Sequence, residues 1–291
     1  MMMGQITDIV AVVFDFDDTL VPDSTTMLLK SHGIDTDDFW GIQARELIHQ
    51  GYDPPTAYLN LMLRNVGEGK PLGLLTNQKL TEFGASLDTK FHDGLPQFFE
   101  DVWLEVKSRF KNIEVEFYIV SAGLQAVMEG SGIVRKYFRA AYGCQLAGDD
   151  ERGVLKYIKR CITFTEKTRY LFEINKGIDP SESRSNPYLV NKFFAEGDRR
   201  IPFTNMIYVG DGITDIPCFS MIEKFKGLAF GVFDPGKRDK AKQALEEFLQ
   251  PHRVVSMHAP KFTPDSELGA MLRTAVANRC LAIQLHRKAA L

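Results

Sequence analysis

The chain has 291 residues, of which 44% are hydrophobic and 25% charged, and this composition is ordinary for a globular protein with a sizeable core. Its formal net charge of −3 gives no electrostatic argument for binding nucleic acid or an anionic membrane surface. The sequence has no apolar run of the roughly 20 residues that a membrane span needs and no signal-peptide pattern at residues 1–5. We therefore expect a cytoplasmic protein without nucleic-acid or membrane partners.

Buried strand and amphipathic helix patterns alternate along most of the chain. Strands are expected at residues 6–16, 115–120, 140–146, 155–163, 206–209 and 228–233, with a short edge strand at 254–256. Helices are expected at residues 94–110, from after 123 to about 138, at 168–175 and at 264–288, and a polar loop at 179–186. Such alternation predicts an α/β fold with a mostly parallel, Rossmann-like sheet and right-handed crossovers.

Residues 22–91 differ from the rest of the chain in their sequence pattern, because they carry only short helical patterns interrupted by Gly and Pro. Helices are expected at about 35–51, 54–67 and 77–91. We predict an all-helical cap domain at 22–91, inserted into a catalytic core formed by 1–21 and 92–291. The alternative, that these helices simply pack on the main domain, stays open.

The cysteines and histidines show no metal-binding or disulfide pattern. Cys144, Cys161, Cys218 and Cys280 have no Cys-x-x-Cys spacing, which favours reduced thiols that fill core space. The six histidines lack the i, i+4 spacing of a helical metal site.

Two acidic clusters follow strand patterns that lie far apart in the sequence. Asp15 and Asp17 follow a run of β-branched and aromatic residues. The spacing of the residues after Asp15 does not match a calcium-binding loop. A solvated turn stays an alternative interpretation. Asp211 and Asp215 follow the strand at 206–209. The carboxyl ends of parallel strands share one edge of a sheet, so the four carboxylates are expected to converge and to require a cation. Mg²⁺ fits best, because it prefers oxygen ligands and is held by carboxylates together with substrate phosphates.

With these motifs, the sequence resembles the haloacid dehalogenase (HAD) superfamily of phosphohydrolases. Residues 15–19 match its first motif, Asp-x-Asp-x-Thr, with Asp18 in place of a frequent Gly, a variant that we interpret as structural. Ser121, followed by Ala122 and Gly123, matches the second motif, and residues 210–215 match the acidic motif Gly-Asp-x-x-x-Asp. The remaining motif is a single lysine, for which Lys167 is preferred over Lys176 and Lys159.

The resemblance implies roles for these residues. Asp15 would be the nucleophile that forms an aspartyl-phosphate, and Asp17 would act as general acid and then as general base. Phosphate would be bound by Ser121, Ala122 and Lys167. The implied Mg²⁺ ligands are Asp15, Asp17 (through its backbone carbonyl), Asp211 and Asp215.

These roles predict a Mg²⁺-dependent phosphomonoesterase that acts on a small phosphorylated metabolite. Two alternatives share the same core residues: a phosphomutase or phosphotransferase, and a non-catalytic protein that binds a phosphorylated ligand. Within the insertion, Arg45, Arg64 and Lys70 are candidate contacts to an anionic leaving group, and solvated surface charge is the competing interpretation.

Overall fold

The fold is built on one seven-stranded sheet, seen in a computed structural model that describes residues 8–148, 151–236, 242 and 245–289. The strand order is β4-β3-β2-β1-β5-β6-β7, and every neighbouring pair is parallel except β3 with β4. The strands are β1 (Ile9–Phe14), β2 (Glu114–Leu124), β3 (Phe138–Gly148), β4 (Leu155–Arg160), β5 (Met206–Gly210), β6 (Leu228–Val232) and β7 (Ser256–His258). The predicted α/β class with a mostly parallel sheet is confirmed.

The central strand β1 fixes where the neighbouring strands end. From Val10 to Phe14 it is completely buried, as expected for a strand covered on both faces. Phe14 is aligned with Ile119 of β2 and with Val209 of β5. The residues just beyond these positions therefore meet at one edge of the sheet.

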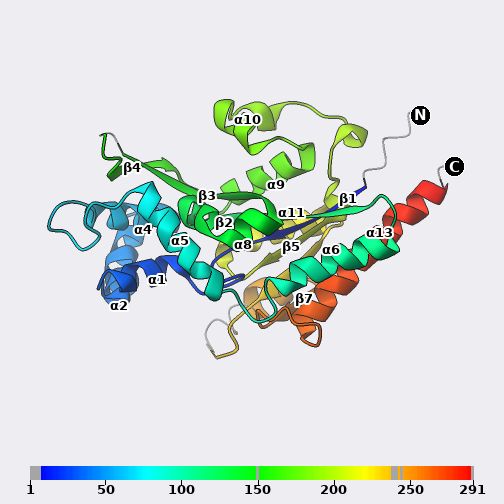
Figure 1. Ribbon diagram of the computed structural model, residues 1–291, viewed down its shortest axis with the longest axis horizontal. Coiled ribbons are helices and arrows are strands. Elements are labelled where there is room, and N and C mark those ends of the chain that lie inside the picture. The colour runs from blue at the N-terminus through cyan, green and yellow to red at the C-terminus, as the bar shows by residue number, and fades with distance from the viewer. Residues whose placement is uncertain (1–7, 149–150, 237–241, 243–244, 290–291) are drawn as a thin grey trace.

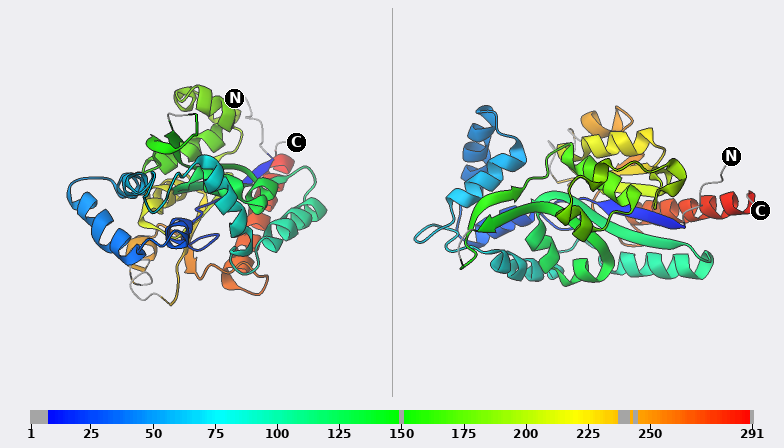
Figure 2. Two further views of the ribbon diagram at one scale, coloured as in Figure 1. Left: turned by 60° about the vertical axis from the view of Figure 1, so that its left-hand side comes forward. Right: turned by 90° about the horizontal axis from the view of Figure 1, so that it is seen from above.

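Helices cover both faces of the sheet (Figure 1 and Figure 2). The helices α6 (Gln97–Arg109), α7 (Gln125–Gly130), α8 (Gly132–Tyr137) and α13 (Glu267–Ala289) lie on one face, and α9 (Glu166–Lys176) and α11 (Ile216–Lys224) lie on the other. Phe14 packs edge-on against Phe99 of α6 at 6.0 Å, whereas Tyr208 of β5 packs against Phe219 of α11 at 5.7 Å. Aromatic contacts of this kind join each layer of helices to the strands.

Residues 22–91 contain helices and turns but no strand longer than an isolated bridge. The elements are α1 (Ser24–Ser31), α2 (Thr36–Asp38), η1 (Phe39–Ala44), α3 (Arg45–His49), α4 (Pro54–Arg64), α5 (Asn77–Ser86) and η2 (Leu87–Thr89). The three helical stretches predicted from the sequence are confirmed, whereas α1 was not predicted. Its N-cap is Asp23, which accepts a hydrogen bond from the backbone N–H of Thr26.

The two parts of this insertion differ in how they contact the rest of the chain. The helices α1 to α4 lie at the end of the molecule opposite to the start of β1 and the end of α13 (Figure 1). In contrast, α5 packs directly on α7, because Gly84 and Gly130 let the two backbones approach closely. Asp88 of η2 then accepts hydrogen bonds from Ser131 and from the backbone N–H of Gly132. The division of the chain into a core and a cap stays a prediction.

Several boundaries differ from the sequence prediction. The expected loop at 179–186 contains the short helix α10 (Pro180–Ser185), which Asp179 caps, so that expectation was wrong. The strand β2 continues through the Ser121 turn to Leu124, and β7 begins where the predicted edge strand ended. Residues 6–7 of the predicted first strand lie outside the described residues. Of the described helices, none is both long and apolar enough to cross a membrane.

The contact between α5 and α7 predicts a strong effect of Gly84→Ala on stability. An added Cβ would lie 1.9 Å from the carbonyl oxygen of Val127, so the helices must separate, and the free energy of unfolding should fall by about 2 kcal/mol or more. Gly41→Ala, in the same insertion, is the matched control, because no atom lies within 4 Å of its added Cβ. Denaturant unfolding of both variants tests this, and equal stability of the two would contradict it.

Candidate active site at the carboxyl ends of the strands

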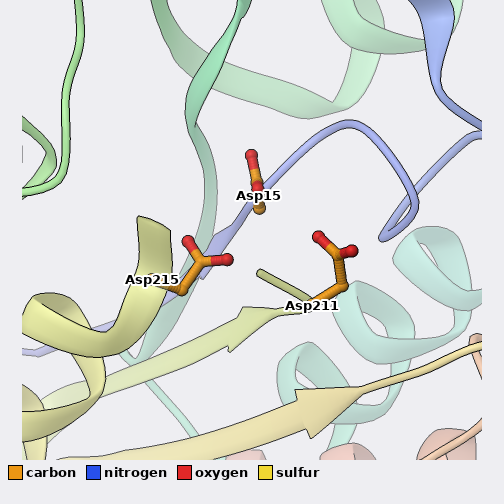
Figure 3. Close-up of side chains that lie close together, drawn as sticks. All are labelled: Asp15, Asp211 and Asp215. Atoms are coloured by element: carbon orange, nitrogen blue, oxygen red, sulfur yellow. The ribbon is translucent and has the colours of Figure 1, made fainter. Parts of the chain in front are cut away.

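Three carboxylates from separate parts of the chain surround one point at the edge of the sheet (Figure 3). Asp15 follows β1, Asp211 follows β5, and Asp215 ends the short helix η6 (Ile213–Asp215). One carboxylate oxygen from each lies within 4.8 Å of the other two. Gly210 makes this approach possible, because a Cβ there would lie 2.6 Å from the carboxylate of Asp215. The sheet thus brings together the two acidic clusters, as expected from the sequence.

Asp15 is held by both its backbone and its side chain. Its N–H donates to the carbonyl of Val209 at 2.8 Å, and its Oδ1 accepts from the N–H of Phe16 at 2.7 Å. Burial raises the pKa of Asp15 to about 6, against the lowering effects of the Lys167 charge and the Ser121 hydroxyl. A nearby cation would favour the ionised form of this carboxyl.

Lys167 is the lysine that reaches the carboxylates. Its side chain is completely buried, and its Nζ lies 3.0 Å from Asp15 Oδ2 and 2.7 Å from Asp215 Oδ1. Burial lowers its pKa, but the two carboxylates raise it by more, so the net pKa lies above the ordinary value for lysine. Lys176 instead donates to the carbonyls of Val190 and Lys192, and Lys159 is exposed on β4. The geometry therefore favours Lys167 over both rivals.

Asp17 lies beside this cluster but in a different environment. Its Oδ1 accepts a hydrogen bond from the N–H of Ser24 at 2.7 Å, and a Cβ on Gly123 would lie 2.5 Å from its Oδ2. Burial, followed by the negative charge of Asp23, raises the pKa of Asp17 to about 8. Its side chain is not one of the three that surround the common point. The next residue, Asp18, has a φ of 54°, a left-handed conformation that explains why Gly would suit this position.

The turn after Ser121 closes the site on the β2 side. The Ser121 side chain is buried, and its Oγ accepts from the N–H of Gly123 at 3.1 Å. The carbonyl of Ala122 accepts from the Tyr58 hydroxyl at 2.6 Å and from the Cys144 thiol at 3.2 Å. The turn is therefore held by the insertion as well as by the sheet.

These groups line a cavity of about 180 Å³. The sheet side of its lining includes Asp15, Asp17, Ser121 and Asp211. The insertion contributes Asp23, Thr25, Trp40 and Tyr58. These four were not identified from the sequence, where only Asp23 had a usable signal, as the cap of a helix that had not been predicted. Arg45, Arg64 and Lys70 are exposed and do not line the cavity.

A larger cavity of about 460 Å³ adjoins this one and shares Asp18 and Asp211 with it. It is lined by prolines, Phe91 and His92, and includes neither Asp15 nor Ser121. The smaller cavity is therefore the candidate active site.

The donor set around the common point suits a hard divalent cation. It consists of carboxylate oxygens from Asp15, Asp211 and Asp215, without sulfur or imidazole ligands among the described residues. Oxygen ligands of this kind are typical of Mg²⁺ rather than of zinc or copper. The four cysteines are free thiols, in agreement with the sequence prediction.

Comparisons with known proteins identify one relative by sequence and several by fold. No family model matches the chain. An uncharacterized protein from Borreliella burgdorferi is 28% identical over 242 residues, which make up 76% of this chain and 80% of that protein.

Two solved structures share the fold. A HAD family hydrolase from Salmonella enterica serovar Typhi superposes with a TM-score of 0.50 at 15% identity, over 80% of this chain and 65% of that one. A probable phosphoserine phosphatase from Vibrio cholerae also gives 0.50, at 14% identity, over 97% of this chain and 68% of that one. The chain thus spans about two thirds of each structure. Together with the strand order and the acidic edge of the sheet, these matches establish that the chain has the fold of the HAD superfamily of hydrolases.

Proposed function

We propose that this protein is a Mg²⁺-dependent phosphomonoesterase that acts on a small phosphorylated compound through an aspartyl-phosphate at Asp15. The observation that carries the proposal is that Asp15, Asp17, Ser121 and Asp211 line one small cavity, while the buried side chains of Lys167 and Asp215 lie against one another and Lys167 contacts Asp15. The two structures of similar fold, one called a HAD family hydrolase and the other a probable phosphoserine phosphatase, support the same reaction class.

Asp15 is placed to act as the nucleophile. In the proposed first step a carboxylate oxygen of Asp15 attacks phosphorus, the bond from phosphorus to the ester oxygen breaks, and the alcohol leaves. The ammonium of Lys167 and the hydroxyl of Ser121 lie beside the attacking carboxylate, where negative charge accumulates on the phosphoryl oxygens. In the second step water attacks the aspartyl-phosphate, which releases phosphate and restores the carboxylate.

Asp17 is the proposed proton carrier. A pKa of about 8 leaves its carboxyl protonated at neutral pH, so it can give a proton to the departing alkoxide. The carboxylate formed in this way then accepts a proton from the water that attacks in the second step. Asp15, with the lower pKa of about 6, is ionised at the same pH.

We assign the Mg²⁺ site to Asp15, Asp211 and Asp215, with the backbone carbonyl of Asp17 as the further expected ligand. The bound cation would neutralise charge on the phosphoryl group and keep Asp15 ionised. Lys167 compensates part of the negative charge of Asp15 and Asp215, with which its ammonium forms ion pairs.

The helices α1 to α4 are the proposed cap. They supply Asp23, Trp40 and Tyr58 to the cavity lining, and covering the cavity in this way would exclude bulk water from the reaction. We leave α5 out of the moving part, because it packs on α7 through Gly84 and Gly130.

The primary test is hydrolysis of p-nitrophenyl phosphate by the wild type and by Asp15→Asn, each with Mg²⁺ and with a chelator. We expect turnover only for the wild type with Mg²⁺, because the amide is not a nucleophile. Phosphate release with water as acceptor distinguishes a hydrolase from a transferase, which would pass the group to an added alcohol. Undiminished activity of Asp15→Asn would refute the assignment of the nucleophile.

The loss of kcat/KM in Asp17→Asn should depend on the leaving group of the substrate. For an alkyl phosphate, whose alkoxide needs a proton, kcat/KM should fall by roughly 10²- to 10⁴-fold. For p-nitrophenyl phosphate the loss should be much smaller, because nitrophenolate leaves without a proton. Since the protonated form is the active acid, wild-type kcat/KM for the alkyl ester should fall as pH rises through about 8. Equal losses for both substrates would exclude the acid role.

The metal site can be tested without activity, through thermal stability. At about a hundredfold excess over its Kd, Mg²⁺ should raise the free energy of unfolding of the wild type by roughly 2–3 kcal/mol. Asp211→Asn should lose most of this increase, while Asp37→Asn, at an exposed position in α2, should keep it. The same Mg²⁺-induced rise in Tm for Asp211→Asn and for the wild type would argue against the site.

A further inference from the structure

The lining that the insertion contributes to the cavity has an unusual chemical character. It combines two aromatic rings, Trp40 and Tyr58, with the carboxylate of Asp23. The rings lie 5.8 Å apart and are inclined at 54° to one another. Among the described residues that line this cavity, none is Lys or Arg. The buried ammonium of Lys167 lies instead against Asp15 and Asp215.

Both aromatic residues use their polar hydrogens inside the protein. The indole N–H of Trp40 donates to Thr26 Oγ1 at 2.8 Å, and the Tyr58 hydroxyl donates to the carbonyl of Ala122 at 2.6 Å. Neither hydrogen is therefore available to bind an anionic or hydroxyl-rich alcohol. With these hydrogens engaged, the groups of the two lining side chains that remain for a ligand are their aromatic rings, and the electron-rich faces of such rings attract cations.

Asp23 is joined to Trp40 through the same threonine. Thr26 Oγ1 donates to Asp23 Oδ2 at 2.6 Å while it accepts from the indole of Trp40. The Thr26 hydroxyl thus fixes a carboxylate and an aromatic ring side by side. Oδ1 of Asp23 accepts the N–H of Thr26 at 2.9 Å, so the carboxylate is held by two hydrogen bonds before any ligand binds.

We propose, building on the proposed phosphatase function, that the substrate is a phosphomonoester of a small amino alcohol, whose ammonium group binds between the rings of Trp40 and Tyr58 and the carboxylate of Asp23. The phosphate would bind at Ser121 and Lys167. The whole cavity, which would hold the phosphoryl group as well as the alcohol, has a volume of about 180 Å³. This favours a small ester, since cavities for drug-sized ligands begin at roughly 300 Å³.

The experiment compares esters that differ in the charge of the alcohol. Phosphocholine and phosphoethanolamine carry a positive alcohol, sn-glycerol 3-phosphate a neutral one, and 3-phosphoglycerate a negative one. We expect wild-type kcat/KM for the cationic esters to exceed that for glycerol phosphate by roughly tenfold or more, as a cation held by aromatic rings and a carboxylate predicts. Phosphoglycerate should be the poorest substrate.

Two variants test the residues that are inferred to produce this preference. Asp23→Asn keeps a side chain that can cap α1 but removes the charge, and Trp40→Leu removes one ring. Each should reduce the ratio of kcat/KM for phosphocholine to kcat/KM for glycerol phosphate by several fold. Asp35→Asn is the matched control, because Asp35 also caps a helix but is exposed and lies outside the cavity lining. It should leave the ratio unchanged.

The outcomes separate this inference from the function on which it rests. Mg²⁺-dependent hydrolysis of p-nitrophenyl phosphate, combined with equal or better turnover of glycerol phosphate or phosphoglycerate than of phosphocholine, would overturn the inference and leave the phosphatase intact. An unchanged ratio in both Asp23→Asn and Trp40→Leu would also overturn it. Absence of turnover with every ester, including the aryl ester, would overturn the phosphatase proposal together with the inference.

Discussion

The contact between the ammonium of Lys167 and the carboxylates of Asp15 and Asp215 is the interaction on which the site depends. All three groups are almost completely removed from solvent. Burying a carboxylate is costly unless a partner compensates its charge, and here one ammonium compensates two. Tyr208 and the N–H of Gly212 complete the hydrogen bonding of Asp215. The result is a set of charges that is held in place before any substrate arrives, a property that favours electrostatic catalysis.

The register of the sheet determines which residues can meet. Because Phe14 is aligned with both Ile119 and Val209, the residues just beyond these three positions lie at the same level of the sheet. Asp15, Ser121 and Asp211 therefore need no long loops to reach one another. Lys167 comes from α9, on one face of the sheet, and Tyr58 from α4 in the insertion. The site is thus assembled from the sheet edge, one flanking helix and the insertion.

The sequence was sufficient to predict the elements that a local hydrophobic pattern or motif identifies. The residues that precede Asp15, Ser121 and Asp211 carry strong hydrophobic strand patterns, and the order of these patterns predicted a parallel sheet with a shared acidic edge. The contributions of Trp40 and Tyr58 were not predictable, because they depend on how α1 to α4 pack at the carboxyl ends of the strands (Figure 1). Likewise, the approach of α5 to α7 depends on Gly84 meeting Gly130, and no local pattern relates these two positions. The helix α10 was missed although Asp179 and Pro180 form an ordinary helix start.

The hydrogen bond from Tyr58 to the carbonyl of Ala122 has a consequence for how this protein can evolve. The hydroxyl supports the turn after Ser121, while the ring that bears it belongs to the part of the cavity lining that the insertion contributes. A substitution at Tyr58 that removes the hydroxyl and reshapes the cavity also leaves the carbonyl of Ala122 without this donor. The side chains of Trp40 and Asp23 form their hydrogen bonds with Thr26 and not with the Ser121 turn, so substituting them does not remove a hydrogen bond from the turn. Divergence among descendants of this protein is therefore expected to begin at Trp40 and Asp23, and to reach Tyr58 only together with a compensating change near the turn.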